Sequence, residues 1–464
     1  MADHFQQQTR NDPLCSFFRW GSRLFPITNS HMCIVEGEVD RHLLGQALQR
    51  TIPDFELLHA LLPNAGQGLT DELVSTIRTE HPIAFDNAGF RRDLMDSIAL
   101  AEPGGLVRTP VRLILVHTAS RARSCVHLGI SHDVADIKSG NIVLARLMEE
   151  YEQLRAGITN KDEAPRIYEH HPLTRLKPAW YKGTAGILRF GRAQLEIGKR
   201  MMARHRTQVR FGHGMQHAAQ EARPASNDFC HLILPAPLQE NIREAAQRYK
   251  VTINTLFSAA LARYIGRHQE KQSPLATYTI AVSLRKMLND AFAESFRSFM
   301  IDCTLRIPHA GNTRELLDAI EAKIAAGRGE QLELELGRME SAISLFRNPL
   351  PKALVLWVMK RTQGTNILYS NPGIIKEDFS AFGGNELPIS DIVIFGCLVP
   401  PYDLMFVTPT VNGRLQLDVV YRKAHFPDIQ RQFVEPFLQE LAGIVAPGKD
   451  QRKATSTEIS SPPL

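Results

Sequence analysis

The sequence has few cysteines, and none lies where cysteines usually pair with one another or bind metal. The six are spread between positions 15 and 397, without a Cys-x-x-Cys pair or a His/Cys cluster at zinc spacing. Neither a disulfide framework nor a metal site is therefore predicted. A reduced, cytoplasmic setting is expected.

The sequence also lacks export signals, long apolar runs and excess charge. Its N-terminus, MADHFQQQTRNDPL, has neither the positive start nor the apolar stretch of a signal peptide. No apolar run approaches the length needed to cross a bilayer, so no transmembrane segment is expected. A net charge of +5 is small for 464 residues, and phosphate-binding glycine patterns are missing. We therefore expect no nucleic acid partner and no permanently bound cofactor.

What remains is the composition of an ordinary globular protein, with 44% hydrophobic and 22% charged residues. Because 464 residues exceed what one core usually supports, two domains or one large composite are expected. We predict an N-terminal subdomain over residues 1–175, a connection over 176–226, a C-terminal subdomain over 227–446 and a disordered tail over 447–464.

Each predicted subdomain begins with a strand, followed by a helix and further strands. In the first, residues 30–39 are the first expected element, Asp40 is a helix N-cap, and strands are expected over 110–118 and 124–131. In the second, a strand near 228 precedes two helices, the second capped by Thr252, and a strand over 277–285. Asn412-Gly413 predicts a hairpin. The pattern indicates a mixed α/β fold.

The segment GISHDVADI places His132 and Asp136 four positions apart, between a predicted strand and a long amphipathic helix. A single match to this spacing is unsurprising in a chain with 17 histidines. One interpretation makes His132 a general base at neutral pH. From this segment alone the favoured interpretation is structural: Asp136 caps the helix, and His132 satisfies a buried hydrogen bond.

Other polar clusters give weaker signals. His170 and His171 are interpreted as a surface or loop pair, and glycines around His213 and His217 argue against a metal-binding helix there. The basic stretch GKRMMARHRTQVR is compatible with a helix on an acidic membrane or anionic ligand, but a solvated connecting helix is favoured.

The order of five motifs adds to these patterns. SHDVAD, the helical segment from ILPAPLQ to ARYI, AVSLR, YSNPG and VNGRLQLDVVY occur in an order that resembles the chloramphenicol acetyltransferase-like superfamily. This superfamily includes condensation domains, alcohol O-acetyltransferases and polyketide-associated acyltransferases. The resemblance spans roughly residues 30–445. It implies an α/β sandwich of two related subdomains that enclose a central channel.

The resemblance also implies roles for particular residues. His132 would deprotonate an alcohol or amine, which attacks an acyl thioester on coenzyme A or on the phosphopantetheine of a carrier protein. Asp136 would be structural and pair with Arg285, at the end of AVSLR. Ser370 or Asn371 of YSNPG is the candidate donor to the oxyanion, although SNPG as a simple turn fits equally well. The reaction would belong to natural-product or lipid biosynthesis.

Two departures from the HHxxxDG motif leave other functions open. Ser131 replaces the first histidine, and Ile137 replaces the glycine after the aspartate. Isoleucine removes both backbone freedom and space, so either the substrate is unusual or turnover is lost. The alternatives are a standalone condensation-type enzyme that forms amides and a catalytically silent binding or scaffold protein of the same fold. The DFGWG signature of plant acyltransferases is missing.

Overall fold

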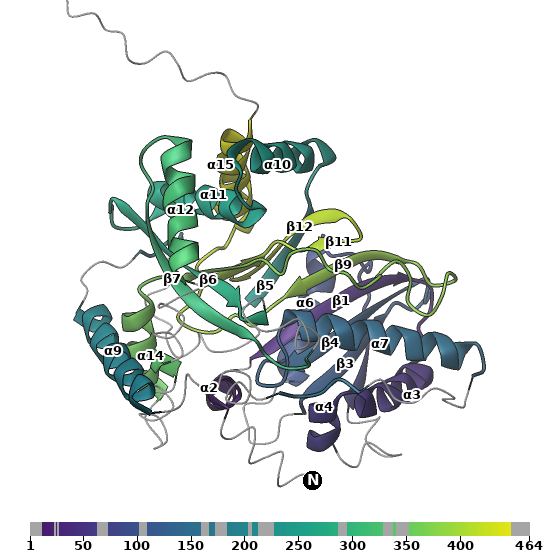
Figure 1. Ribbon diagram of the computed structural model, residues 1–464. Coiled ribbons are helices and arrows are strands. Elements are labelled where there is room, and N and C mark those ends of the chain that lie inside the picture. Colours follow the sequence, from purple (N-terminus) through teal and green to yellow (C-terminus); the bar gives the residue numbers. More distant parts are fainter. Residues whose placement is uncertain are drawn as a thin grey trace, which may run out of the picture.

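The computed structural model describes residues 12–22, 25, 27–62, 73–101, 109–158, 167–171, 183–202, 207–211, 227–285, 295–327, 337–339 and 352–446. These residues form two β-sheets with helices on their outer sides (Figure 1). No helix among the described residues is long and apolar enough to cross a membrane. The predicted tail over 447–464 and the residues His213 and His217 lie outside the described ranges.

The first sheet has the strand order β2-β3-β4-β1-β9. Its strands are β2 (Val74–Arg78), β3 (Val111–His117), β4 (Arg123–Ser131), β1 (Thr28–Glu36) and β9 (Ile389–Phe395). The helices of this half are α2 (Pro13–Ser22), α3 (Arg41–Thr51), α4 (Glu56–Leu61), α6 (Ala88–Ala101) and α7 (Ile137–Arg155). Helix α7 approaches β1 closely at Gly140, where an added Cβ would lie 2.1 Å from Nε2 of His31. A glycine is therefore needed for this helix to sit on its sheet.

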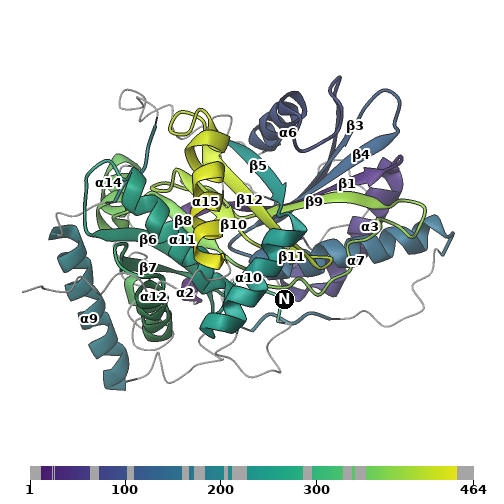
Figure 2. The same cartoon turned by 90° about the horizontal axis from the view of Figure 1, so that it is seen from above.

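The second sheet has the order β11-β12-β10-β8-β6-β7, and β5 pairs with β12. Its strands are β5 (Asn227–Ile233), β6 (Leu275–Ser283), β7 (Met300–Pro308), β8 (Ile367–Ser370), β10 (Leu404–Val407), β11 (Thr410–Val411) and β12 (Arg414–Arg422). Helices α10 (Ala236–Tyr249), α11 (Ile253–His268), α12 (Thr313–Gly327) and α15 (Glu435–Val445) lie on its outer side (Figure 1). Helices α9 (Gly183–Met202) and α14 (Lys352–Gln363) lie at the edge of the molecule (Figure 2).

The two faces of the second sheet bury their side chains in different cores. Ile367 and Tyr369 of β8 pack with the outer helices, whereas Leu368 packs with side chains of the first sheet. Successive strand residues point to opposite faces, so this alternation marks the inner face of the second sheet. Met405, the partner of Leu368 on β10, packs in the same inner core. The two sheets thus share one apolar layer.

Most predicted elements are present. Asp40 and Thr252 accept hydrogen bonds from the backbone of α3 and α11, as their N-cap assignment predicts. Asn412 and Gly413 both have positive φ and connect β11 to β12, which confirms the predicted hairpin.

Two expectations were incomplete. Residues 30–39 do not hold the first element, because helix α2 precedes β1. Strand β9 falls within the predicted C-terminal range 227–446 but pairs with β1 in the first sheet. Its apolar alternation identifies it as a strand, whereas the choice of sheet depends on contacts that periodicity does not encode.

An Asp–His–Asp cluster, in which Asp418 is fully buried and Asp391 partly exposed, connects β9 to the second sheet. Nδ1 of His231 lies 2.5 Å from Asp418, and its Nε2 lies 2.9 Å from Asp391 on β9. The second Asp418 oxygen accepts a hydrogen bond from the backbone N–H of Ile394 at 3.0 Å. Burial opposes the charged form of His231, but the two carboxylates outweigh it and raise its pKa to about 10. The imidazolium therefore joins the two sheets at neutral pH.

We predict that His231→Ala lowers the free energy of unfolding by about 3–5 kcal/mol, because it leaves the buried carboxylate of Asp418 without its cation. His42→Ala, at an exposed position of α3, is the control and changes stability little. Urea titrations measure both.

The pH dependence gives an independent check on His231. Because folding raises the pKa of His231, its charge contributes to the free energy of unfolding in full below the ordinary value of 6.5. This contribution is lost as the pH rises towards about 10. The wild-type protein should lose stability over this interval more steeply than His231→Ala. Equal slopes would contradict the assignment of a charged His231.

Candidate active site

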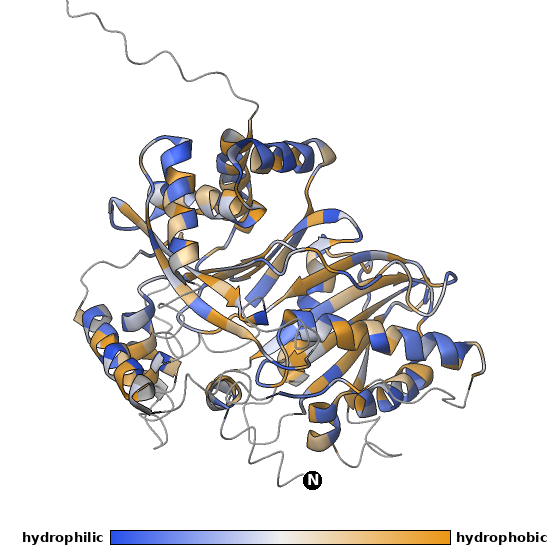
Figure 3. Ribbon diagram, in the orientation of Figure 1, coloured by the Kyte–Doolittle hydropathy of each residue, from blue (hydrophilic) through white to orange (hydrophobic). Residues whose placement is uncertain are grey.

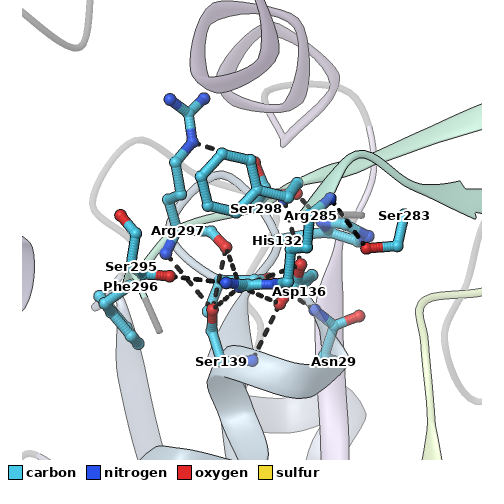
Figure 4. Close-up of polar contacts among 12 residues, drawn as sticks. Asn29, His132, Asp136, Ser139, Ser283, Arg285, Ser295, Phe296, Arg297 and Ser298 are labelled. Carbon is cyan, nitrogen blue, oxygen red and sulfur yellow. Dashed lines mark hydrogen bonds and ion pairs between the residues drawn. The ribbon is translucent and has the colours of Figure 1, made fainter. Parts of the chain in front are cut away.

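His132 follows the last residue of β4, where the chain leaves the sheet. Its backbone N–H donates to the carbonyl oxygen of Ile27 at 2.8 Å, which holds the turn against the start of β1. The side chain is buried, with 4% of its surface exposed. The ring of Phe18 stacks on the imidazole at a centroid distance of 4.1 Å, and Nδ1 lies 3.2 Å from Oγ of Ser298 (Figure 4). The ring is thus held from two sides.

Burial lowers the pKa of His132 below its ordinary value, because the charged imidazolium would lose its hydration. A hydrogen bond to its own backbone carbonyl and the charges of Asp136 and Asp133 oppose this effect without cancelling it. His132 is therefore neutral at neutral pH. A proton on Nδ1, donated to Oγ of Ser298, leaves the lone pair on Nε2.

Asp136 combines the two structural roles that the sequence suggested for it. Its Oδ1 accepts a hydrogen bond from the backbone N–H of Ser139 at 2.8 Å, which caps α7. The same oxygen lies 3.0 Å from Nη2 of Arg285, two residues after the end of β6, in the second half of the chain. The predicted cap and the predicted ion pair are both present in the structure.

Arg285 is the centre of a wider polar network. Its Nη2 also donates to Oγ of Ser139 at 2.6 Å and to the carbonyl oxygen of Arg297 at 3.0 Å, and Nη1 donates to that of Ser295 at 2.8 Å (Figure 4). Burial alone would raise the pKa of Asp136, but the Arg285 charge and nearby N–H donors lower it below its ordinary value. Asp136 therefore stays ionised.

A second buried ion pair holds the segment that carries Ser298. The guanidinium of Arg297 lies 2.8 Å from Oδ1 of Asp12, and neither side chain is exposed. Asp12 also accepts hydrogen bonds from the backbone N–H groups of Leu14 and Cys15, so it caps α2 as Asp136 caps α7. This pair fixes both the position of α2 and the residue next to Ser298.

Three contacts place α2 over the SHDVAD turn. They are the Asp12–Arg297 pair, the stacking of Phe18 on His132, and an ion pair between Arg19 and Asp133 at 3.5 Å. Sequence reasoning assigned no role to this helix or to Ser298. Asp12-Pro13, an N-cap residue followed by proline, is a local signal that predicts the helix start. No local pattern signals its contact with His132.

Ser370 and Asn371 are the sequence-predicted oxyanion donors. Ser370 is buried, and its partner on β10 is Val407, a residue of the inner core, so it belongs to the inner face of the second sheet. Oδ1 of Asn371 accepts a hydrogen bond from the N–H of Gly373 at 2.8 Å, as in an Asx turn. The hydroxyl of Ser298 lies beside the His132 ring. That Ser370 or Asn371 donates a hydrogen bond to the oxyanion stays a prediction.

The two departures from HHxxxDG have ordinary surroundings. Ser131 donates through Oγ to Asp133 at 2.5 Å, which supports the turn. Ile137 is the first residue of α7 and packs in the first core, and its φ is not among the positive values of the described residues. Isoleucine is therefore unstrained there, but its side chain fills space that glycine would leave open.

The other predicted clusters have different outcomes. His170 is not at the surface: it is buried, and its Nδ1 lies 3.4 Å from the carbonyl oxygen of Phe296. His170 and His171 lie outside helices and strands, as the loop interpretation predicted, but the surface interpretation was wrong for His170 because neighbours distant in sequence cover it. In the described ranges, no group of three or more His, Cys, Asp or Glu side chains is arranged to hold a metal ion.

We predict that Arg285→Ala destabilises the protein by about 3 kcal/mol, because the buried carboxylate of Asp136 loses its partner. Arg285→Lys should recover only part of this, because an ammonium cannot match the acceptors that the guanidinium reaches. Arg314→Ala removes an exposed ion pair on α12 and should cost less than about 0.5 kcal/mol. Thermal and urea unfolding of the three variants measure the difference, and equal costs for Arg285→Ala and Arg314→Ala would contradict it.

No protein-family model and no curated protein matches the sequence. Solved structures do match. The trichothecene 15-O-acetyltransferase TRI3 of Fusarium sporotrichioides is 11% identical with a TM-score of 0.69, over 94% of this chain and 93% of that chain.

Condensation domains match over similar lengths. The first condensation domain of the calcium-dependent antibiotic synthetase is 15% identical with a TM-score of 0.62, over 94% of this chain and 95% of that one. The condensation domain of the monacolin K polyketide synthase MokA is 14% identical with a TM-score of 0.59, over 93% of this chain and 96% of that one. At such identities the match concerns the fold. The protein has the two-sheet, chloramphenicol acetyltransferase-like fold that these acetyltransferases and condensation domains share.

Proposed function

We propose that the protein is an acyltransferase that moves an acyl group from a thioester to an alcohol or amine. The donor would be an acyl-CoA or an acyl carrier protein, and the acceptor a small molecule. The observation that carries this proposal is His132: a buried, neutral imidazole with Nδ1 engaged and its ring held by Phe18. Such a group is suited to accept a proton.

The proposed step uses Nε2 of His132 as the base. It takes the proton from the acceptor hydroxyl or amine as the oxygen or nitrogen attacks the thioester carbonyl carbon. The resulting oxyanion needs a positioned donor, for which Ser370 is the candidate because it belongs to the inner face of the second sheet. Collapse of the intermediate breaks the carbon–sulfur bond, and the imidazolium returns its proton to the thiolate.

Asp136 and Arg285 have a positioning role in this proposal. Their ion pair fixes the turn that follows β4 relative to β6, so that His132 and the second sheet keep one geometry. Phe18 and Ser298 restrict the imidazole ring itself. Such restriction raises the fraction of time in which the base is aligned with the acceptor.

Two other functions are compatible with the same site. A condensation-type enzyme would use the same base on an amine, and solved condensation domains are similar in fold. A silent binding protein is favoured only by Ile137, whose side chain fills space beside the motif. The neutral His132 and the intact Asp136–Arg285 pair favour catalysis over this alternative.

We predict that purified protein forms ester or amide products from a panel of acyl-CoA and carrier-bound thioesters, and that His132→Ala lowers the rate by about 10²–10⁴-fold. Mass spectrometry of the products identifies the acceptor class. Product formation that is unchanged in His132→Ala would overturn the base assignment. Binding of donors by both proteins, without product from either, would favour the silent binding protein.

The pH profile of the reaction tests the protonation state of the base. Because burial lowers the pKa of His132, kcat/KM should be constant around neutral pH and fall with one protonation below the ordinary value of 6.5. Phe18→Ala and Ser298→Ala should lower kcat more than they raise KM, because they loosen the ring without removing the base. In Phe18→Ala the fall should move to higher pH as water reaches the imidazole. An unmoved profile would contradict a positioning role for Phe18.

A further inference from the structure

Large exposed apolar side chains gather on two neighbouring helices. Of the thirteen that the described residues contain, five lie on α9 and two on α14. They are Ile187, Leu188, Phe190, Leu195, Met202, Leu354 and Trp357. The two helices lie side by side at the edge of the molecule in both ribbon views (Figures 1 and 2). Ordinary soluble surfaces carry such side chains singly, so this concentration marks an interaction surface.

The exposed side chains of α9 form a stripe. Leu188, Leu195 and Met202 follow one another at intervals of seven residues and are 66%, 68% and 74% exposed. Seven residues are close to two helical turns, so the three lie on one side of the helix. Arg189 and Ala193 are buried on another side, where they contact Gly337. Helix α9 is therefore attached by one side and presents an apolar stripe on another. Figure 3 shows hydrophobic and hydrophilic residues alternating along this helix.

Basic side chains border the apolar stripe. Arg192 and Lys199 each follow a stripe leucine by four residues, which places them beside it, and both are exposed. Helices α9 and α14 together carry seven Lys or Arg residues and one Glu, a net charge of +6. The whole chain carries only +5. Positive charge therefore exceeds negative charge on the two helices that carry these exposed apolar side chains, although Arg189 is itself buried.

Helix α14 adds an aromatic anchor to the same region. Trp357 is 52% exposed, and the guanidinium of Arg361 lies 5.9 Å from the centre of its ring. Tryptophan is favoured at the boundary between lipid headgroups and acyl chains, because its ring is apolar and its N–H is polar. Leu354, one turn earlier, is also exposed.

We propose that the α9–α14 surface, defined by Leu188, Arg192, Leu195, Lys199, Met202 and Trp357, binds the anionic face of a phospholipid membrane. Leucine and methionine side chains along a helix can enter the acyl boundary, while flanking Arg and Lys contact lipid phosphates. An acidic protein would satisfy the basic residues but would need a matching apolar groove along the whole stripe. A fluid bilayer accommodates such a stripe without a matching groove. The stretch GKRMMARHRTQVR begins within α9, and for it the proposal takes up the acidic-membrane alternative in place of the solvated connecting helix that the sequence favoured.

Vesicle co-sedimentation of the full-length protein tests the proposal. Vesicles of phosphatidylcholine with phosphatidylserine should sediment the protein, and pure phosphatidylcholine should sediment much less. Leu195→Glu and the double variant Arg192→Glu, Lys199→Glu should each lower the partition coefficient roughly tenfold or more. Leu100→Glu is the matched control, because Leu100 is 81% exposed on α6, away from the surface. Binding that is equal in Leu195→Glu and Leu100→Glu would overturn the proposal.

Two further measurements separate the alternatives. Brominated lipids should quench tryptophan fluorescence in the wild-type protein and less in Trp357→Phe, because Trp357 would lie at the lipid boundary. Equal quenching in both would overturn the proposed orientation. Titration with a phosphopantetheinylated acyl carrier protein tests the alternative of an acidic protein partner. Carrier binding that Arg192→Glu, Lys199→Glu abolishes, together with no vesicle binding by the wild type, would replace the membrane with an acidic protein partner.

Discussion

Two buried guanidinium groups determine how the halves of the molecule meet. Arg285 and Arg297, from the second half of the chain, each bind an aspartate that caps a helix in the first half. Both guanidinium carbons lie 4.7 Å from the ring centre of Phe299. A buried charge without its partner costs several kcal/mol, so each arginine tolerates few positions other than the one observed. The apolar layer between the sheets supplies contact area, whereas these ion pairs specify how one half of the chain is positioned against the other.

The position of the candidate base follows from this constraint. Asp136 fixes the start of α7, and the turn before α7 carries His132. Asp12 fixes α2, which places Phe18 on one face of the imidazole, while Arg297 is the neighbour of Ser298, which contacts Nδ1. Both ion pairs therefore help to position groups that contact the imidazole ring of His132. The structural role of Asp136 and the proposed chemical role of His132 depend on one arrangement, although the sequence presented them as competing interpretations.

Much of this site was predictable from local sequence, and the rest was not, for a physical reason. Asp136 precedes an amphipathic helix, which marks it as a cap, and the resemblance in motif order identified Arg285 as its partner; the structure contains both contacts. Phe18 and Ser298 lie 114 and 166 positions from His132, and neither sits in a pattern that local periodicity can detect. The apolar alternation of β9 is typical of a strand, but its place beside β1 depends on tertiary contacts such as the Asp391–His231 pair. Local physics gives element types and caps; the partners across sheets come from the global fold.

The second polar cluster shows that the same principle is used twice. Asp391, His231 and Asp418 join β9 to β5 and β12. Strand β9 comes from the second half of the chain but pairs in the first sheet, and these charged contacts hold it to the second sheet. Apolar burial alone specifies the relative position of the sheets less sharply, because the hydrophobic effect is non-directional. Hydrogen-bonded ion pairs are satisfied in one geometry only. Separate ion pairs, one of them the Asp136–Arg285 pair near His132, therefore fix the inter-sheet geometry, and the apolar layer supplies most of the burial.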